Sequence, residues 1–221
     1  AKGDSCLACR RCEKICRSKA INLDEMAWTE QVRVGAIILT TGFKLYDPTP
    51  AEQYGYGRFP NVVTSIQYER LASRAGPTGG TIKRPWDMKE PRRIAWLQCI
   101  GSRDQEHNYC SSICCMYATK EAVLAKQRDP GVACQVFMMD ERTFSKEYNA
   151  YFDQARNQYG VKYTRCRISG LKEEPLTRDV IVSYQSKDGV MHEEKFDLVV
   201  LSVGSEPPPR AVALAKQLGI R

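Results

Sequence analysis

Four cysteines lie close together in the middle of the chain and suggest metal or redox chemistry. The eighteen-residue segment QCIGSRDQEHNYCSSICC contains Cys99, Cys110, Cys114 and Cys115. Each iron of a [4Fe-4S] cube takes one thiolate, and this set supplies four. The segment therefore predicts a [4Fe-4S] cluster at this place.

The same cysteines allow three other uses. Zinc prefers paired knuckles of two cysteines, and the adjacent Cys114 and Cys115 are awkward for a tetrahedral site. A redox disulfide between those two would strain the backbone and leave Cys99 and Cys110 without a role. All four thiols would also be acceptable as small buried apolar groups. The cluster is favoured because it uses every one of them.

A second cysteine motif lies at the start of the sequence. CLACRRCEKIC has the ferredoxin spacing C-x2-C-x2-C-x3-C, formed by Cys6, Cys9, Cys12 and Cys16. In two-cluster ferredoxins the fourth cysteine binds the other cluster, and this chain has no second run of that kind. A second [4Fe-4S] cluster is thus one interpretation of this motif, with its fourth ligand left open.

Composition limits the class of protein. The chain has 221 residues, 43% of them hydrophobic, which is enough for one sizeable core. Its cysteines are grouped rather than spread as disulfides would be, and no apolar run is long enough to cross a bilayer, so we expect a cytoplasmic protein without a membrane contact. The net charge of +7 is scattered among acidic residues. This argues against nucleic acid and favours docking to an acidic redox partner.

Strand and helix patterns must position the central cysteines. Residues 32–39 have the pattern of a buried strand, and residues 47–80, rich in Pro, Gly and Tyr, that of a long irregular connection. From Pro91 strands alternate with helices, and SKDG is typical of the turn of a β-hairpin. The fold class is therefore α/β: a Rossmann-like three-layer domain with a β-hairpin addition and an N-terminal partial ferredoxin-like segment.

The turn after the first strand of this alternating region indicates whether the domain binds a dinucleotide. A dinucleotide-binding domain would carry G-x-G-x-x-G there, but this turn has the sequence CIGSRD, with Cys99 at the carboxyl end of the strand. Cys110 and Cys114 are expected on one face of the following helix. The dinucleotide function is therefore expected to be lost and a thiolate-binding group to take its place.

Several strings resemble a known family. VGAIILTTGF, YGYGRFPNVVTS, IAWLQCIGSRD, YCSSICCMYATKEAVLAK and FDLVVLSVGSEP are similar to the A subunit of heterodisulfide reductase, which is the flavin and iron–sulfur subunit of methanogenic archaea and related bacterial complexes. The resemblance implies a thioredoxin-reductase-like core that binds FAD, with a ferredoxin domain inserted into the flavin domain. It also implies an unusual cluster bound by Cys99, Cys110, Cys114 and Cys115. By the same resemblance, the residues that match the family's flavin-domain segments are Thr41, Gly42, Phe43, Gly204, Glu206 and Pro207.

The resemblance also implies a division of the chain. Residues 1–30 match part of the ferredoxin insert, 31–90 a flavin-domain strand and connecting loops, 91–196 the Rossmann-like domain with the cluster site, and 197–221 the return to the flavin domain. The family's Gly-rich FAD fingerprint and its C-terminal ferredoxin region are not in the chain, which is expected to be an excerpt. FAD binding is an open expectation for that reason.

The expected function is that of an electron-transfer module that relays electrons between iron–sulfur clusters and FAD. The implied partners are other subunits of a heterodisulfide reductase-like complex, hydrogenase or formate dehydrogenase donors, and ferredoxin; a homodimer is a further arrangement to test. The chain alone is not expected to complete the enzymatic reaction. Two competing interpretations are a noncatalytic iron–sulfur adaptor or assembly subunit without flavin, and a dithiol oxidoreductase that uses Cys114 and Cys115.

Other residues have simpler interpretations. Cys134 and Cys166 fall in apolar strand patterns and are expected in the core. His107 is expected to be an exposed loop residue. Arg103 and Asp104 are expected to form a structural pair, the alternative being that Arg103 donates hydrogen bonds that raise the potential of the cluster.

Overall fold

The computed structural model describes residues 6–220. It divides the chain into two compact units, Ala1–Thr40 and Thr41–Arg221. The smaller unit contains one short helix, α1 (Arg11–Ile15). Arg10 pairs with Glu13 and Asp24 there, at 2.6 and 2.5 Å.

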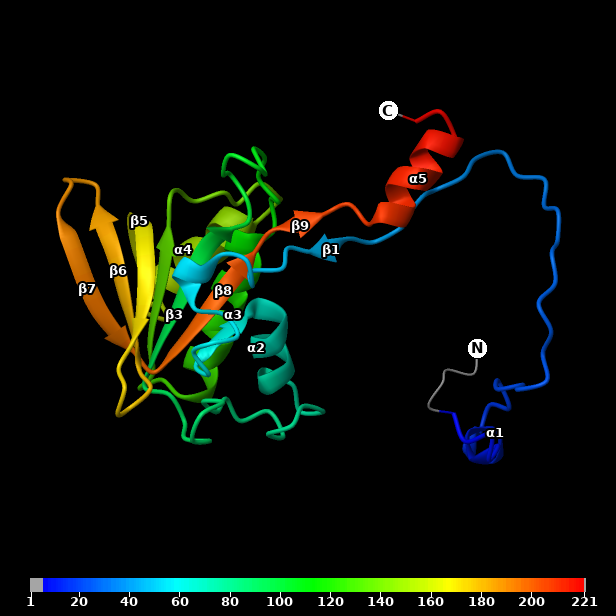
Figure 1. The fold of residues 1–221 in the computed structure, drawn as a ribbon, viewed down its shortest axis with the longest axis horizontal. Coiled ribbons are helices and arrows are strands. Elements are labelled where there is room, and N and C mark those ends of the chain that lie inside the picture. Colours follow the sequence, from blue (N-terminus) through cyan, green and yellow to red (C-terminus); the bar gives the residue numbers. More distant parts are fainter. Residues whose placement is uncertain (1–5, 221) are drawn as a thin grey trace. The chain divides into compact units, whose positions relative to one another are not determined.

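The larger unit is built on a seven-stranded sheet (Figure 1). Its first five strands in spatial order run parallel, and the last two are antiparallel additions. The strand order is β2 (Val62–Thr64), β8 (Leu198–Val203), β3 (Arg93–Ile100), β4 (Ala133–Met138), β5 (Lys162–Glu173), β6 (Val180–Ser186) and β7 (Met191–Phe196). Every residue of β8 is buried, as expected for a central parallel strand covered on both faces.

Helices and strands cover opposite faces of this sheet. The helices α2 (Ser65–Ala72), α3 (Cys114–Arg128) and α4 (Tyr148–Asn157) contribute to one apolar cluster, together with Trp96 and Val136 of the central strands. On the other face the sheet curls, so that Phe196 of β7 joins Leu97 and Phe137 in a second cluster. The predicted α/β fold and hairpin are confirmed, and the second cluster is completed by loop residues such as Tyr54 and Phe59.

Two predictions about the N-terminal half were wrong. Residues 32–39 form no strand, and Ile38 is 87% exposed, because no strand in the described part of the chain pairs with this apolar run. Residues 47–80 are not irregular throughout. They contain a 3-10 turn (Glu52–Tyr54), strand β2 and helix α2, whose first turn is held by a capping box between Thr64 and Gln67.

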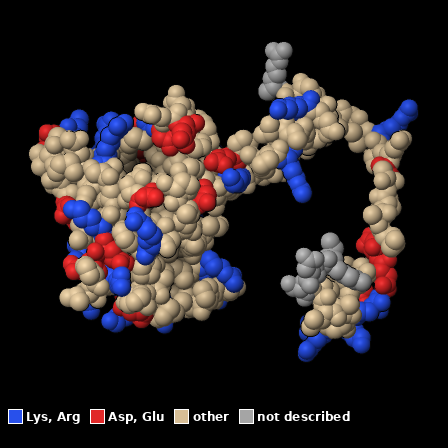
Figure 2. All heavy atoms as spheres, viewed as in Figure 1, with Lys and Arg blue, Asp and Glu red and all other residues tan. Residues whose placement is uncertain are grey.

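The chain ends in a short ladder and a helix. Strand β1 (Lys44–Leu45) pairs antiparallel with β9 (Ser205–Glu206), and α5 (Pro209–Gln217) follows. Among the residues that the structure describes, no helix is long and apolar enough to span a bilayer. Figure 2 shows basic and acidic side chains interspersed over the visible face, in agreement with the scattered charge of the sequence.

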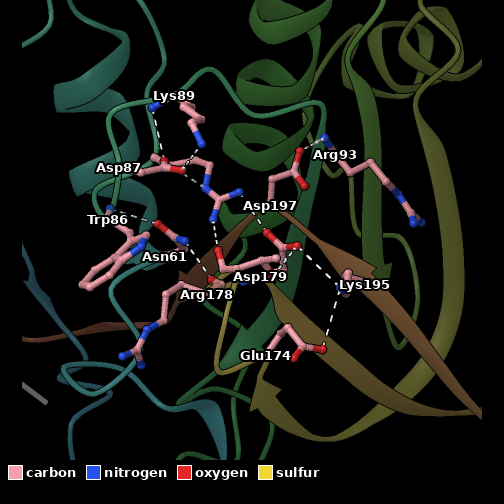
Figure 3. Close-up of polar contacts among 12 residues, drawn as sticks. Asn61, Trp86, Asp87, Lys89, Arg93, Glu174, Arg178, Asp179, Lys195 and Asp197 are labelled. Atoms are coloured by element: carbon pink, nitrogen blue, oxygen red, sulfur yellow. Dashed lines mark hydrogen bonds and ion pairs between the residues drawn. The ribbon is translucent and has the colours of Figure 1, made fainter.

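A polar network fastens loops to the strands β6 and β7 (Figure 3). Arg84, 8% exposed, donates from Nη1 to Asp179 at 2.8 Å and from Nη2 to the carbonyl of Thr177 at 2.6 Å. Lys195 of β7 lies 3.6 Å from the same Asp179 and 3.8 Å from Glu174. One buried guanidinium thus holds the loop around residue 84 against the start of β6.

A carboxylic acid lies buried between helix α3 and strand β3. Glu121 is 1% exposed and accepts a hydrogen bond from Trp96 Nε1 at 2.8 Å, while its Oε1 has no hydrogen-bond partner within the described residues. Burial, with a smaller contribution from the nearby Glu69, raises its pKa to about 9, although the hydrogen bond from Trp96 and the charge of Lys120 act in the opposite direction. The side chain is therefore neutral in the folded protein at pH 7.

This neutral Glu121 should make the protein less stable as pH rises. Between the unfolded pKa of 4.5 and the folded pKa of about 9, the folded chain binds one proton more than the unfolded chain. The free energy of unfolding should then fall by about 1 kcal/mol per pH unit in that range. Glu121→Gln should remove this slope, measured by urea denaturation between about pH 5.5 and 8.5. Glu69→Gln, which removes the exposed ion pair with Lys120, should leave the pH slope in place. Equal slopes for E121Q and the unchanged chain would contradict the assignment of the slope to Glu121.

Candidate iron–sulfur site

The four central cysteines lie at the carboxyl end of β3, in the loop that follows it and at the start of helix α3. Cys99 is the last residue but one of β3 and has a left-handed φ of +63°, where the ladder with β8 shifts register. Cys114 and Cys115 are the first two residues of α3. Cys114 is buried, and the other three are partly buried.

Cys110 is not on the helix, so the expectation that it shares a helical face with Cys114 was wrong. The helix begins at Cys114, because Ser112 has a φ of +62° and an α-helix cannot include it. Cys110 lies instead in the loop between β3 and α3, where its sulfur accepts a hydrogen bond from the amide of Ser112 at 3.3 Å. Cys110 therefore approaches the site from the loop side.

The loop of residues 101–113 is tied down by many hydrogen bonds. Ser102 donates to the carbonyl of Tyr109 at 2.8 Å, and Ser111 Oγ accepts from the amide of Ser205 at 2.9 Å. Gly204 packs directly on this loop: a Cβ atom there would lie 2.5 Å from the carbonyl oxygen of Gly101. The loop that carries Cys110 is thus fixed against the end of β8.

The four thiols influence one another electrostatically. Burial raises the pKa of Cys99 and Cys115 to about 11 each and raises that of Cys114 as well. In addition, the charges of Cys110, Cys114 and Cys115 all raise the pKa of Cys99. Cys99, Cys114 and Cys115 therefore stay protonated by themselves and need a strong positive charge to become thiolates, which coordinated metal provides.

The number of central thiols is the number that a [4Fe-4S] cluster takes. Within residues 6–220, no group of three or more His, Cys, Asp or Glu side chains is arranged so that it could hold a metal ion. A single zinc ion needs all its sulfur ligands within about 2.3 Å of one point. A [4Fe-4S] cube takes one thiolate at each of four separate irons and so spreads its ligands more widely. Four mutually interacting thiols from a strand end, a loop and a helix start have the number and chemistry for the cube.

The N-terminal cysteines are described only within their own unit. Cys6, Cys9 and Cys12 are exposed, and Cys16 is partly buried. The hydroxyl of Ser18 lies 3.3 Å from the Cys16 sulfur and lowers the pKa of that thiol, and the amide of Ala20 donates to it at 3.4 Å. The motif stays a prediction for a second cluster.

The residues expected beside a flavin occupy the short β1–β9 region. Phe43 is 60% exposed, and a Cβ at Gly42 would meet no atom within 4 Å. Glu206 contacts Lys44 at 3.2 Å and the Nε2 of His107 at 3.4 Å. Thr41, Pro207 and their neighbours are exposed to solvent or lie at the edge of the β1–β9 ladder. In the described part of this chain these residues form no cradle for a flavin.

Two polar residues near the cysteines, His107 and Arg103, differ from expectation. His107 is only 19% exposed in its side chain, because it packs edge-on against Tyr46, with ring centroids 5.3 Å apart. Arg103 pairs with Asp140 rather than with Asp104. Asp140 follows β4, whose carboxyl end adjoins that of β3 in the parallel sheet. This position after a neighbouring parallel strand is the sequence feature from which Asp140 could have been predicted as a residue of the site.

Cys134 and Cys166 are buried in the two apolar clusters, as predicted. Burial raises the pKa of both thiols to about 12. They are therefore core residues and serve as natural controls for the central cysteines.

Comparison with known proteins adds the following findings. No family model matches the chain. It is 43% identical over 220 residues to the iron-sulfur A subunit of the CoB–CoM heterodisulfide reductase of Methanocaldococcus jannaschii, covering 98% of this chain and 34% of that protein. It is 36% identical over 222 residues to the A subunit of the H2:CoB–CoM heterodisulfide, ferredoxin reductase of Methanothermobacter marburgensis, covering 98% and 33%. The chain thus spans about a third of the length of these relatives.

A further relative and one solved structure complete the comparison. The A subunit of the H2/formate:CoB–CoM heterodisulfide, ferredoxin reductase of Methanococcus maripaludis is 41% identical over 206 residues, with 92% of this chain and 31% of that protein covered. Among solved structures, a thioredoxin reductase of T. acidophilum superposes with a TM-score of 0.43 at 13% identity, covering 77% of this chain and 44% of that one.

Proposed function

Because this chain is related over nearly its whole length to about a third of the A subunit of heterodisulfide reductases, we propose that it is an iron–sulfur electron-transfer module of that kind. The proposal is supported by the position of four thiols, whose charges act on one another, at and just after the carboxyl end of β3, the edge where open α/β sheets hold their ligands. A [4Fe-4S] cluster bound there would accept and release one electron at a time.

The chain's own residues would hold and shield this cluster. Cys99, Cys110, Cys114 and Cys115 would supply the thiolates. Burial of Cys114, together with the carbonyl of Val203 and the hydroxyl of Tyr117 behind it, closes the inner side of the site to water. Shielding on this inner side limits reorganisation when charge moves, which favours electron transfer over reaction with solvent.

Flavin, partners and the second cluster belong to the same proposal. The relatives are named as iron–sulfur subunits and as reductases of heterodisulfide and ferredoxin, linked in some cases to H2 or formate. We infer that the chain works within such a complex, next to subunits or segments that complete a FAD site and receive electrons from hydrogenase, formate dehydrogenase or ferredoxin. Cys6, Cys9, Cys12 and Cys16 would bind the second cluster.

Iron, acid-labile sulfide and flavin measured on one anaerobic sample test the function. The proposal expects about four irons and four sulfides at the central site, with a broad absorption that dithionite bleaches. Structured flavin bands in the same sample would place FAD on this chain, and their absence would favour an adaptor that receives electrons from flavin elsewhere. A colourless sample without iron, whose four central thiols are freely alkylated, would overturn the proposal in favour of thiol chemistry.

A further inference from the structure

A fixed positive charge lies beside the central cysteines. Arg103 stands in the loop after β3 with a left-handed φ of +61°, and its amide donates to the carbonyl oxygens of His107 and Tyr109 at 2.7 and 3.0 Å. Its side chain is 22% exposed. The backbone around this residue is therefore held in one conformation, and the guanidinium starts from a defined place.

Asp140 binds that guanidinium with both oxygens. Arg103 Nη1 donates to Oδ1, and Nη2 donates to Oδ2 at 3.1 Å, a two-point contact that only arginine can make. Arg142 donates to the same carboxylate at 3.2 Å. Two cations around one carboxylate leave the group with a net positive charge.

This cationic group faces the cysteines. Arg103 and Cys99 line one cavity of about 680 Å³, and the charge of Arg103 lowers the pKa of the Cys99 thiol, against the larger effect of burial. The backbone of Arg142 acts on Cys115 in the same direction, as a hydrogen-bond donor. The loop after β3 thus brings the charge of Arg103 to Cys99, and the loop after β4 brings the backbone donor of Arg142 to Cys115.

We propose that Arg103, oriented by Asp140, raises the reduction potential of the cluster held by the central cysteines. This inference rests on the proposed function. Reduction adds one electron and therefore one negative charge to the cluster, and a cation fixed nearby stabilises the reduced form more than the oxidised form. Arg103 is partly shielded from solvent, so that water screens its charge less than that of a surface arginine.

The test is a potentiometric titration, followed by electron paramagnetic resonance, of the full 221-residue chain loaded with iron and sulfide. Dithionite supplies the electron. Arg103→Gln should keep the iron content and shift the midpoint potential to lower values. At the midpoint of the unchanged chain, the ratio of reduced to oxidised cluster should fall about tenfold, the effect of losing one charge-assisted contact.

Matched variants separate this role from others. Arg165→Gln removes a charge from an exposed arginine on the neighbouring β5, which donates to the carbonyl of Met139, and should shift the potential much less. Arg103→Lys keeps the charge without the two-point contact and should give a midpoint potential between those of R103Q and the unchanged chain. If R103Q cannot hold four irons, the R103K protein provides the test. A midpoint potential of R103K equal to that of the unchanged chain would contradict the need for orientation by Asp140.

Failure of the inference is distinguishable from failure of the proposed function. A loaded R103Q protein whose potential equals that of the unchanged chain, or moves no more than that of R165Q, would overturn the role of Arg103 and leave the cluster in place. An unchanged chain that binds no iron would overturn both.

Discussion

Replacing Cys99 by serine is expected to lower the iron content of the anaerobically prepared chain by about four atoms, with an equal loss of sulfide. A serine oxygen is a poorer ligand for iron than a thiolate, and the three remaining cysteines would leave one iron of the cube without its protein ligand. The measurement is iron and sulfide per chain, together with the absorption that dithionite bleaches. Cys114→Ser, at the start of α3, should behave in the same way.

Matched cysteine controls give this experiment its specificity. Cys134→Ala removes a buried thiol of the helix-side core, and the iron content should not change. Cys6→Ser should lower only whatever iron the N-terminal motif binds. Equal iron in C99S and in the unchanged chain would contradict the central site, whereas tight zinc in place of iron would indicate a tetrahedral site instead.

Replacing Arg84 by alanine is expected to cost about 3–5 kcal/mol of unfolding free energy, because it leaves the buried Asp179 without its main cationic partner. Asp179 keeps the hydroxyl of Thr177 at 2.7 Å and Lys195 at 3.6 Å, so the loss should fall at the lower end of that range. The measurement is urea denaturation at neutral pH. Arg84→Lys keeps the charge but not the two hydrogen bonds to Asp179 and Thr177. Its unfolding free energy should lie between those of the unchanged chain and of R84A.

A nearby exposed pair provides the contrast. Lys89 lies 3.4 Å from Asp87 in the same network (Figure 3), but its side chain is 78% exposed. Lys89→Ala should change the unfolding free energy by no more than about 0.5 kcal/mol. If both variants cost the same, burial would not be what makes the Arg84 contact strong.

The alternation of strands and helices after Pro91 could be predicted from the sequence because its apolar runs repeat at strand and helix spacing. The buried runs around Trp96, Val136 and Val200 became β3, β4 and β8 of one parallel sheet. Cys99 could be placed at the carboxyl end of its strand for the same reason. The strand predicted from the apolar run of residues 32–39 is not formed. The run is exposed, because a strand needs a neighbouring strand for its hydrogen bonds and no strand among the described residues pairs with it.

Short elements among Pro and Gly could not be predicted from sequence patterns either. Strand β2 has three residues, too few to show alternation, and it is a strand because β8 lies beside it. The start of α3 was misjudged by a few residues because Ser112 adopts a left-handed φ, which its residue type does not indicate.

The sequence by itself determined the set of possible ligands: four thiols at a turn where a dinucleotide-binding domain carries glycines, and a ferredoxin-type motif that begins at Cys6. Only the tertiary structure decided what surrounds the thiols. Arg103 lies next to Asp104 in the chain, yet it pairs with Asp140, which is 37 residues away. The physical reason is that parallel strands bring their carboxyl ends to one edge, so the partner of a charge there is chosen by the neighbouring strand and not by the neighbouring residue.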